Sequence, residues 1–150
     1  MIKHTIRLMV ASALLCNVAF AQSVDEGKQL YYYERYNSAK ETLEKVVASK
    51  PDDVEAVYWL GQTLIELHDT AGAKAVYQKA LQAKGSEPLL LVGMGHVELL
   101  ENKTNEARQR FETAISLTKG KDVGIYDAVG HANVDAAAGD ANYAIQKLKA

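Results

Sequence analysis

The segment WLGQTLIELHDTAGAKAVYQKA, residues 59–80, contains two helical patterns joined by a short polar turn. Before the turn, Leu60, Leu64 and Leu67 recur at intervals of three and four residues, the spacing that buries one face of an α-helix. A second apolar stripe follows, formed by Ala73, Val76, Tyr77 and Ala80. Because Asp69 can cap the start of this second helix, the segment predicts a helix hairpin.

The same pattern recurs along the chain with a period of 34 residues. Four series keep this step: Gly27, Gly61 and Gly95; Ala39, Ala73 and Ala107; Leu43, Tyr77 and Phe111; Val46, Ala80 and Ala114. A fourth unit follows with slippage, since Gly130 lies 35 residues after Gly95 and Ala144 lies 37 after Ala107. A fixed period of this length is typical of stacked repeats. We therefore expect units at 22–53, 54–87, 88–121 and 122–150.

These residues resemble the tetratricopeptide repeat family, which has a small residue late in the first helix and Ala, aromatic and Ala positions in the second. The matching residues are Ala39, Leu43, Val46 and Pro51, then Trp59-Leu60-Gly61, Ala73, Tyr77 and Ala80, then Gly95, Ala107, Phe111 and Ala114. The resemblance implies an all-α, right-handed superhelical solenoid of antiparallel helix hairpins, with about three full repeats and an incomplete fourth. Because Gly139-Asp140 follows a lengthened first helix or turn, we expect the packing of the fourth unit to depart most from the family.

The first 21 residues have the pattern of a secretory signal peptide. The basic residues Lys3 and Arg7 precede the apolar run 8–15, and the small-residue triplet Ala19-Phe20-Ala21 offers a cleavage site. The apolar run is too short to cross a hydrocarbon core of ~30 Å. We expect residues 1–21 to be removed and the tetratricopeptide repeat domain, residues 22–150, to reach the periplasm or the outer membrane, with no integral membrane span.

Cys16 offers an alternative way of processing, because bacterial lipoproteins are cleaved before a Cys that is then acylated. Their signal has a small residue before the Cys, whereas Leu15 precedes Cys16. Cleavage after Ala21 is therefore our main expectation, and lipid anchoring at Cys16 is the alternative.

Charge and motifs narrow the functional class. Seventeen Lys and Arg against 19 Asp and Glu give a net charge of −2, which supplies no basic surface for a nucleic-acid backbone. The sequence holds no Gly-x-Ser-x-Gly, no phosphate-binding glycine loop and no His-Glu-x-x-His. We therefore expect no nucleic-acid partner, no cofactor and no enzymatic activity.

The fourth unit contains a candidate metal site, because Asp127 and Asp135 flank His131 by four residues on either side. His96 occupies the equivalent place one repeat earlier. Imidazole and carboxylate groups can ligate a metal, and His can titrate near pH 6. Residues four apart on a helix also pair on a solvated face without any ligand, and we favour that interpretation and expect no metal.

In the tetratricopeptide family, the first helices of successive repeats line a concave groove that holds a peptide or a partner helix. The shared glycine register places the following residues in this groove: Lys28, Tyr31, Tyr32, Tyr58, Gln62, Ile65, Glu66, Leu89, Val92, His96, Leu99, Asp127, His131 and Asp135. The expected groove is aromatic at the first unit, mixed at the second, apolar at the third and acidic at the fourth. The alternative for each residue is packing against a neighbouring helix. Gln62, His96 and His131 stand where some relatives carry an Asn that helps to hold a C-terminal carboxylate, so we expect no such clamp.

The function that follows is a protein–protein interaction scaffold in the bacterial cell envelope, which binds a peptide or helix of another protein. The alternative is an N-terminal structural or assembly segment of a larger multidomain envelope protein. Because solenoids need a polar terminal cap and the last unit shows none, we also expect either a longer array or self-association through the C-terminal repeat.

Overall fold

The computed structural model describes residues 23–149, so the predictions for residues 1–21 and for Cys16 lie outside the described residues. Within this range the chain forms eight α-helices and no strand. They are α1 (Val24–Tyr32), α2 (Tyr36–Ser49), α3 (Val54–Glu66), α4 (Thr70–Lys84), α5 (Pro88–Leu100), α6 (Thr104–Leu117), α7 (Val123–Asp135) and α8 (Ala141–Leu148). The predicted all-α class is confirmed.

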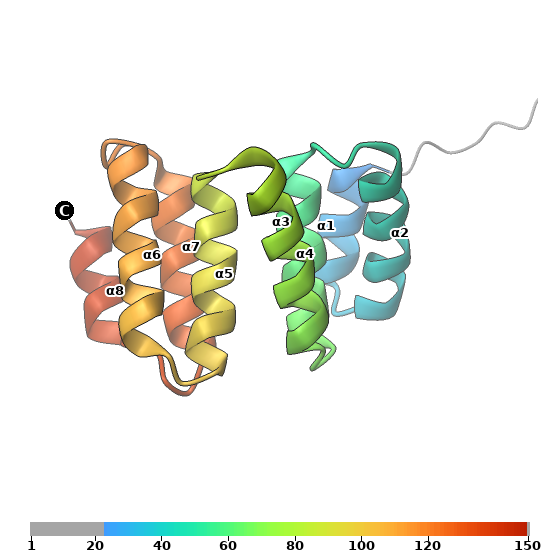
Figure 1. Ribbon diagram of the computed structural model, residues 1–150. Coiled ribbons are helices and arrows are strands. Elements are labelled where there is room, and N and C mark those ends of the chain that lie inside the picture. Colours follow the sequence, from blue (N-terminus) through green and yellow to red (C-terminus); the bar gives the residue numbers. More distant parts are fainter. Residues whose placement is uncertain (1–22, 150) are drawn as a thin grey trace, which may run out of the picture.

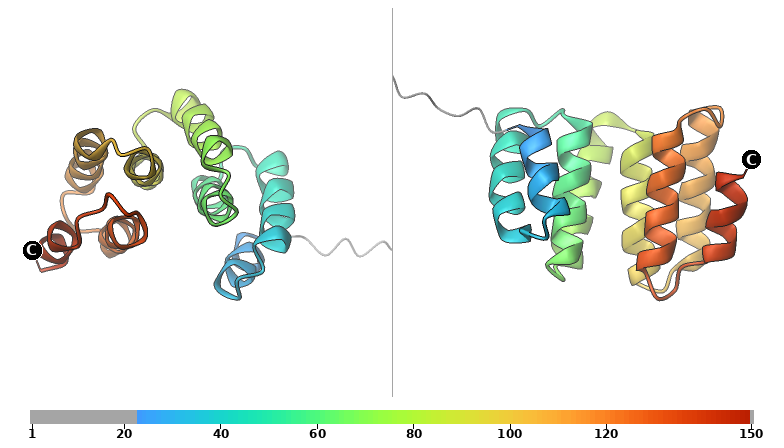
Figure 2. Two further views of the ribbon diagram at one scale, coloured as in Figure 1. Left: turned by 90° about the horizontal axis from the view of Figure 1, so that it is seen from below. Right: turned by 180° about the vertical axis from the view of Figure 1, so that it is seen from behind.

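The helices are arranged as consecutive antiparallel hairpins, α1–α2, α3–α4, α5–α6 and α7–α8, stacked side by side (Figure 1). Viewed along the helix axes, the hairpins follow an arc (Figure 2). The first helix of each hairpin lies on the inner side of the arc and the second on the outer side (Figure 2). The predicted solenoid of helix hairpins is therefore confirmed, and its inner surface belongs to α1, α3, α5 and α7.

The turn inside each of the first three hairpins repeats every 34 residues. Glu34, His68 and Asn102 have φ angles of 57°, 60° and 60°, in the left-handed region. In each case the following residue donates its N–H to the carbonyl five residues earlier, as Asp69 does to Leu64 at 2.8 Å. This arrangement ends the first helix and reverses the chain. The fourth hairpin turns differently, since α7 ends in an extended Ala136.

Glycines at the inner helices make room for large side chains of the outer ones. Gly61 and Gly93 face the ring of Tyr77 from two adjacent first helices, and an added Cβ at Gly93 would lie 2.5 Å from that ring. Gly95 faces Phe111 in the same way. The fourth unit lacks this close contact, because a Cβ at Gly130 would meet only Leu148, at 3.7 Å. The lengthened α7–α8 connection thus changes the packing that the other repeats share.

Helix α5 is the centre of the core. All residues from Leu90 to Leu99 are buried, and α5 contacts α3, α4, α6 and α7. A helix with neighbours on every side is apolar all round rather than amphipathic. Among the described residues, no helix is both long and apolar enough to span a membrane.

Candidate partner-binding groove

The inner side of the arc holds a groove with a volume of about 920 Å³. Its walls come from α1 and α3 on one side and from α7 and α8 on the other, with Leu89 at the start of α5. Nine of the residues predicted from the repeat register line it: Lys28, Tyr31, Tyr32, Tyr58, Gln62, Leu89, Asp127, His131 and Asp135. That these residues bind a partner stays a prediction.

One wall of the groove is aromatic. Tyr31, Tyr32 and Tyr58 surround Trp59 with ring centroids 5.2 to 5.5 Å away, each in an edge-on arrangement. The Lys28 Nζ atom lies 5.6 Å from the centre of the Trp59 ring and 2.6 Å from Glu55 Oε1. Tyr32 is 67% exposed. The wall therefore presents ring surface to the solvent, a surface on which apolar and cationic groups both bind well.

The opposite wall carries an acidic row on α7. Asp127, His131 and Asp135 follow one another at intervals of four residues, and all three are exposed. Asp122 caps the start of the same helix by accepting the N–H of Gly124 at 2.9 Å. Lys28 is the only Lys or Arg among the described residues that line the groove. Carboxylates therefore outnumber cations in the groove.

A chain of hydrogen bonds joins the second, third and fourth repeats and ends at Asp135 of the acidic row. Tyr77 donates its hydroxyl to the Tyr58 carbonyl at 3.0 Å and accepts from Gln62 Nε2 at 2.9 Å. The Gln62 Oε1 atom lies 3.1 Å from His96 Nδ1, and His96 Nε2 lies 2.8 Å from Asp135 Oδ2. Figure 2 shows α3, α5 and α7, which carry all of these residues except Tyr77, adjacent on the inner side of the arc.

The hydrogen bonds of this chain place an acceptor group at each ring nitrogen of His96. A carbonyl only accepts, so Tyr77 must donate to Tyr58, and Gln62 must then present its oxygen to His96 Nδ1. The hydrogen bond between His96 Nε2 and Asp135 holds the pKa of the Asp135 carboxyl below its usual value. His96 is 1% exposed, so its ring joins the second repeat to the fourth within the packed interior.

The helix hairpins agree with comparisons to known proteins. The sequence model described as tetratricopeptide repeat matches residues 30–90. This segment consists of tetratricopeptide repeats. Two crystal structures of MamA are similar in fold, each with 22% sequence identity and a TM-score of 0.56. The similarity covers 84% and 87% of this chain and 72% of each MamA chain. No curated protein matches the sequence.

The tetratricopeptide fold carries a general functional consequence. Proteins of this fold are in general non-enzymatic scaffolds for protein–protein interaction. At 22% identity, the MamA structures support the fold of this chain.

Five residues expected in the groove do not line it: Ile65, Glu66, Val92, His96 and Leu99. Val92 and Leu99 are 1% and 3% exposed, because α5 is enclosed by its four neighbouring helices. Ile65 is also buried, and Glu66 accepts the hydroxyl of Tyr31 at 3.0 Å. The expected apolar section at the third repeat was therefore wrong. These residues fit the alternative expectation, which was packing against a neighbouring helix.

The sequence reasoning also missed part of the groove. Ala144, Ile145 and Leu148 on α8 line it, although only first helices were expected to do so. Ile145 and Leu148 are 47% and 57% exposed. The signal for them was the apolar spacing of the last helix together with the missing polar cap, but the repeat register assigns second helices to the outer side.

No metal site is evident in residues 23–149, where His, Asp and Glu side chains nowhere form a group of three or more that could hold an ion. His96 and His131 do approach each other, with ring centroids 5.9 Å apart and the rings edge-on. The nitrogens of His96 are both engaged by Gln62 and Asp135. His96 therefore connects the second, third and fourth repeats.

Proposed function

We propose that this chain is a protein-interaction module of the bacterial cell envelope, which binds a peptide or helix of another protein in its concave groove. The observation that carries the proposal is the groove itself, with exposed aromatic and apolar side chains on opposing walls. Tyr32 and Val134 are 67% and 75% exposed, and both line it. Covering such apolar surface is favourable by ~25 cal/mol per Å².

A capture experiment with matched double variants tests the groove. Tyr32→Ala with Val134→Ser removes exposed side chains from the two walls, whereas Tyr33→Ala with Leu117→Ser removes exposed side chains outside the groove. The four side chains are 49% to 75% exposed, so neither pair disturbs the core. We expect the groove pair alone to lose the envelope proteins that residues 22–150 capture. Equal capture by both pairs would contradict binding in the groove.

The envelope location is supported by the basic, apolar and small-residue pattern of residues 1–21. Cell fractionation with N-terminal sequencing tests it. We expect a chain that starts at Gln22 in the periplasmic or outer-membrane fraction. A cytoplasmic chain that retains Met1 would refute export, and a chain that starts at an acylated Cys16 would establish lipid anchoring instead.

A second candidate function is assembly, because α7 and α8 expose several apolar side chains. Val123, Ile145 and Leu148 are 77%, 47% and 57% exposed. Such a surface favours self-association or the packing of a further structural element. Light scattering of residues 22–150 over a range of concentrations tests self-association. We expect a dimer that Leu148→Lys dissociates and Leu117→Lys leaves intact, whereas a monomer at all concentrations would argue against this role.

A further inference from the structure

We propose that the groove selects a partner segment that carries basic as well as apolar side chains, with the basic side chains bound at the first half of α7. This inference rests on the proposed function, since it specifies the chemistry of the groove's occupant. Its evidence is the balance of charge along the groove and the position of the apolar side chains relative to that charge.

Two carboxylates of the groove have no cation to balance them. Lys28 is paired with Glu55 at 2.6 Å, and the buried His96 is paired with Asp135 at 2.8 Å. Asp122 and Asp127 line the groove as well, and neither forms an ion pair within residues 23–149. An uncompensated pair of carboxylates in a concave wall attracts a cationic ligand and repels an anionic one.

Aromatic rings lie across from these carboxylates. Tyr58 on α3 and Asp127 on α7 line the same groove. Burial raises the pKa of the Tyr58 phenol, and the negative charge of Asp127 raises it further. The exposed ring of Tyr32 belongs to the same wall as Tyr58. A Lys or Arg side chain bound between the walls would meet a carboxylate on one side and ring faces on the other, two contacts that favour a cation.

The apolar part of the groove lies toward α8. Val134, Ile145 and Leu148 are exposed and line this part, and α8 adds no charged residue to the groove. Asp127 and Val134 are seven residues apart on α7, which corresponds to about 10 Å along the helix axis. An amphipathic segment of about two helical turns therefore spans both parts, with its basic and apolar side chains separated along its length or on two faces.

Three synthetic peptides of equal length and leucine content test this selection by fluorescence anisotropy. They form helices of about four turns and carry lysine, glutamine or glutamate on the polar face. We expect the lysine peptide to bind residues 22–150 about tenfold more tightly than the glutamate peptide, with the glutamine peptide between them. The difference should shrink as salt is added. Equal binding of the three, tighter binding of the glutamate peptide, or binding of none would overturn the proposal.

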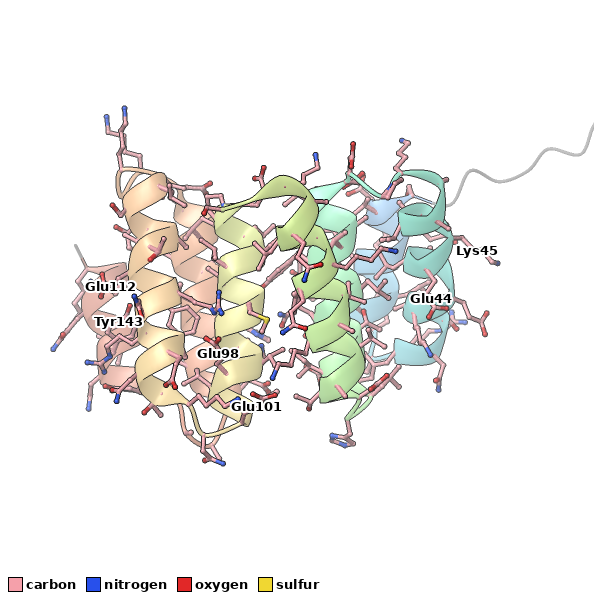
Figure 3. The ribbon with its side chains drawn as sticks, viewed as in Figure 1. Glu44, Lys45, Glu98, Glu101, Glu112 and Tyr143 are labelled. Carbon is pink, nitrogen blue, oxygen red and sulfur yellow. The ribbon has the colours of Figure 1, made fainter. Side chains whose placement is uncertain are left out.

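Charge reversal separates binding in the groove from attraction to an acidic protein. Asp127→Lys reverses a groove charge, and Glu44→Lys makes the same change in net charge on α2, whose side chain at 44 projects from the outer face of the arc (Figure 3). We expect Asp127→Lys to weaken the lysine peptide about tenfold and Glu44→Lys to change its affinity less than about twofold. Equal weakening by both variants would refute selection by the groove.

The failure of this inference is distinguishable from the failure of the proposed function. If Tyr32→Ala with Val134→Ser abolishes binding of all three peptides while Asp127→Lys affects none, the groove binds partners without selecting charge, and only the inference fails. If the groove pair binds the lysine peptide as tightly as the wild type does, the groove is not the binding site and both fail.

Discussion

At the scale of single residues, the 34-residue register has a direct packing cause. Glycine recurs on the first helices because a side chain of the second helix occupies the space that a Cβ would need. Tyr77 is fully buried between Gly61 and Gly93, and Phe111 packs against Gly95. The fourth repeat keeps a glycine, Gly130, without the close contact. Gly130 is therefore not equivalent to Gly61 and Gly95, although the sequence pattern treats the three alike.

This difference predicts opposite effects of two identical substitutions. Gly61→Ala inserts a methyl group against the Tyr77 ring, and overpacking of this kind costs about 1–3 kcal/mol, more than the gain in helix propensity of up to ~1 kcal/mol. Gly130→Ala meets only Leu148 at 3.7 Å, so the propensity gain remains. Urea unfolding should show a loss of stability for the first and none for the second. A loss of equal size in both would contradict the packing account.

The His96–Asp135 pair predicts how stability responds to acid. The pKa of Asp135 is lower in the folded chain than its ordinary value of 3.8, chiefly because of the hydrogen bond from His96 and in smaller part because of His131. The pair therefore stabilises the fold at pH values above 3.8, and this stabilisation is lost as the pH falls through the lower, folded-state value.

Asp135→Asn removes the dependence of folding stability on the protonation of this carboxyl group. At pH 7 we expect the variant to be less stable than the wild type by about 1 kcal/mol, less than a fully buried charged hydrogen bond contributes, because solvent screens a side chain that is 36% exposed. The gap should close as the pH falls below 3.8 in urea unfolding series. A gap that stays constant as the pH falls would show that Asp135 does not accept this hydrogen bond.

At the scale of elements, the bounds of the helices follow from local signals. Asp69 and Asp140 cap α4 and α8 through the N–H groups of Gly72 and Tyr143, at 2.8 and 3.0 Å. The sequence predicted the Asp69 cap and the apolar stripes because both depend on near neighbours. It could not predict that α5 is enclosed on all sides, since that depends on how the helices of the neighbouring repeats pack against it. Val92 and Leu99 were misplaced for this reason.

The turns within hairpins predict a second matched pair of variants. His68 and Asn102 have the same φ of 60°, but a left-handed backbone costs His more than Asn, whose short side chain tolerates it. His68→Gly should stabilise the chain by about 0.5–1 kcal/mol and Asn102→Gly by less. Thermal unfolding with both variants gives the comparison, and destabilisation by His68→Gly would show that its side chain contributes more than the turn costs.

At the scale of the whole molecule, the groove was predictable in position and only partly in composition. The register alone located nine lining residues, all of them on α1, α3, α5 and α7, the helices on the inner side of the arc (Figure 2). The contribution of Ile145 and Leu148 depends on the fourth hairpin, whose longer connection the repeat pattern does not describe. Here the departure from the repeat adds apolar surface to one end of the groove.

The claim that partners bind on the concave side is tested most directly by site-specific photo-crosslinking in living cells. A photoreactive phenylalanine replaces either Tyr32, which lines the groove, or the adjacent Tyr33, which is 74% exposed and lies outside it. We predict a crosslinked partner from position 32 and none from position 33. Crosslinks of equal yield from both positions, or from position 33 alone, would contradict the account.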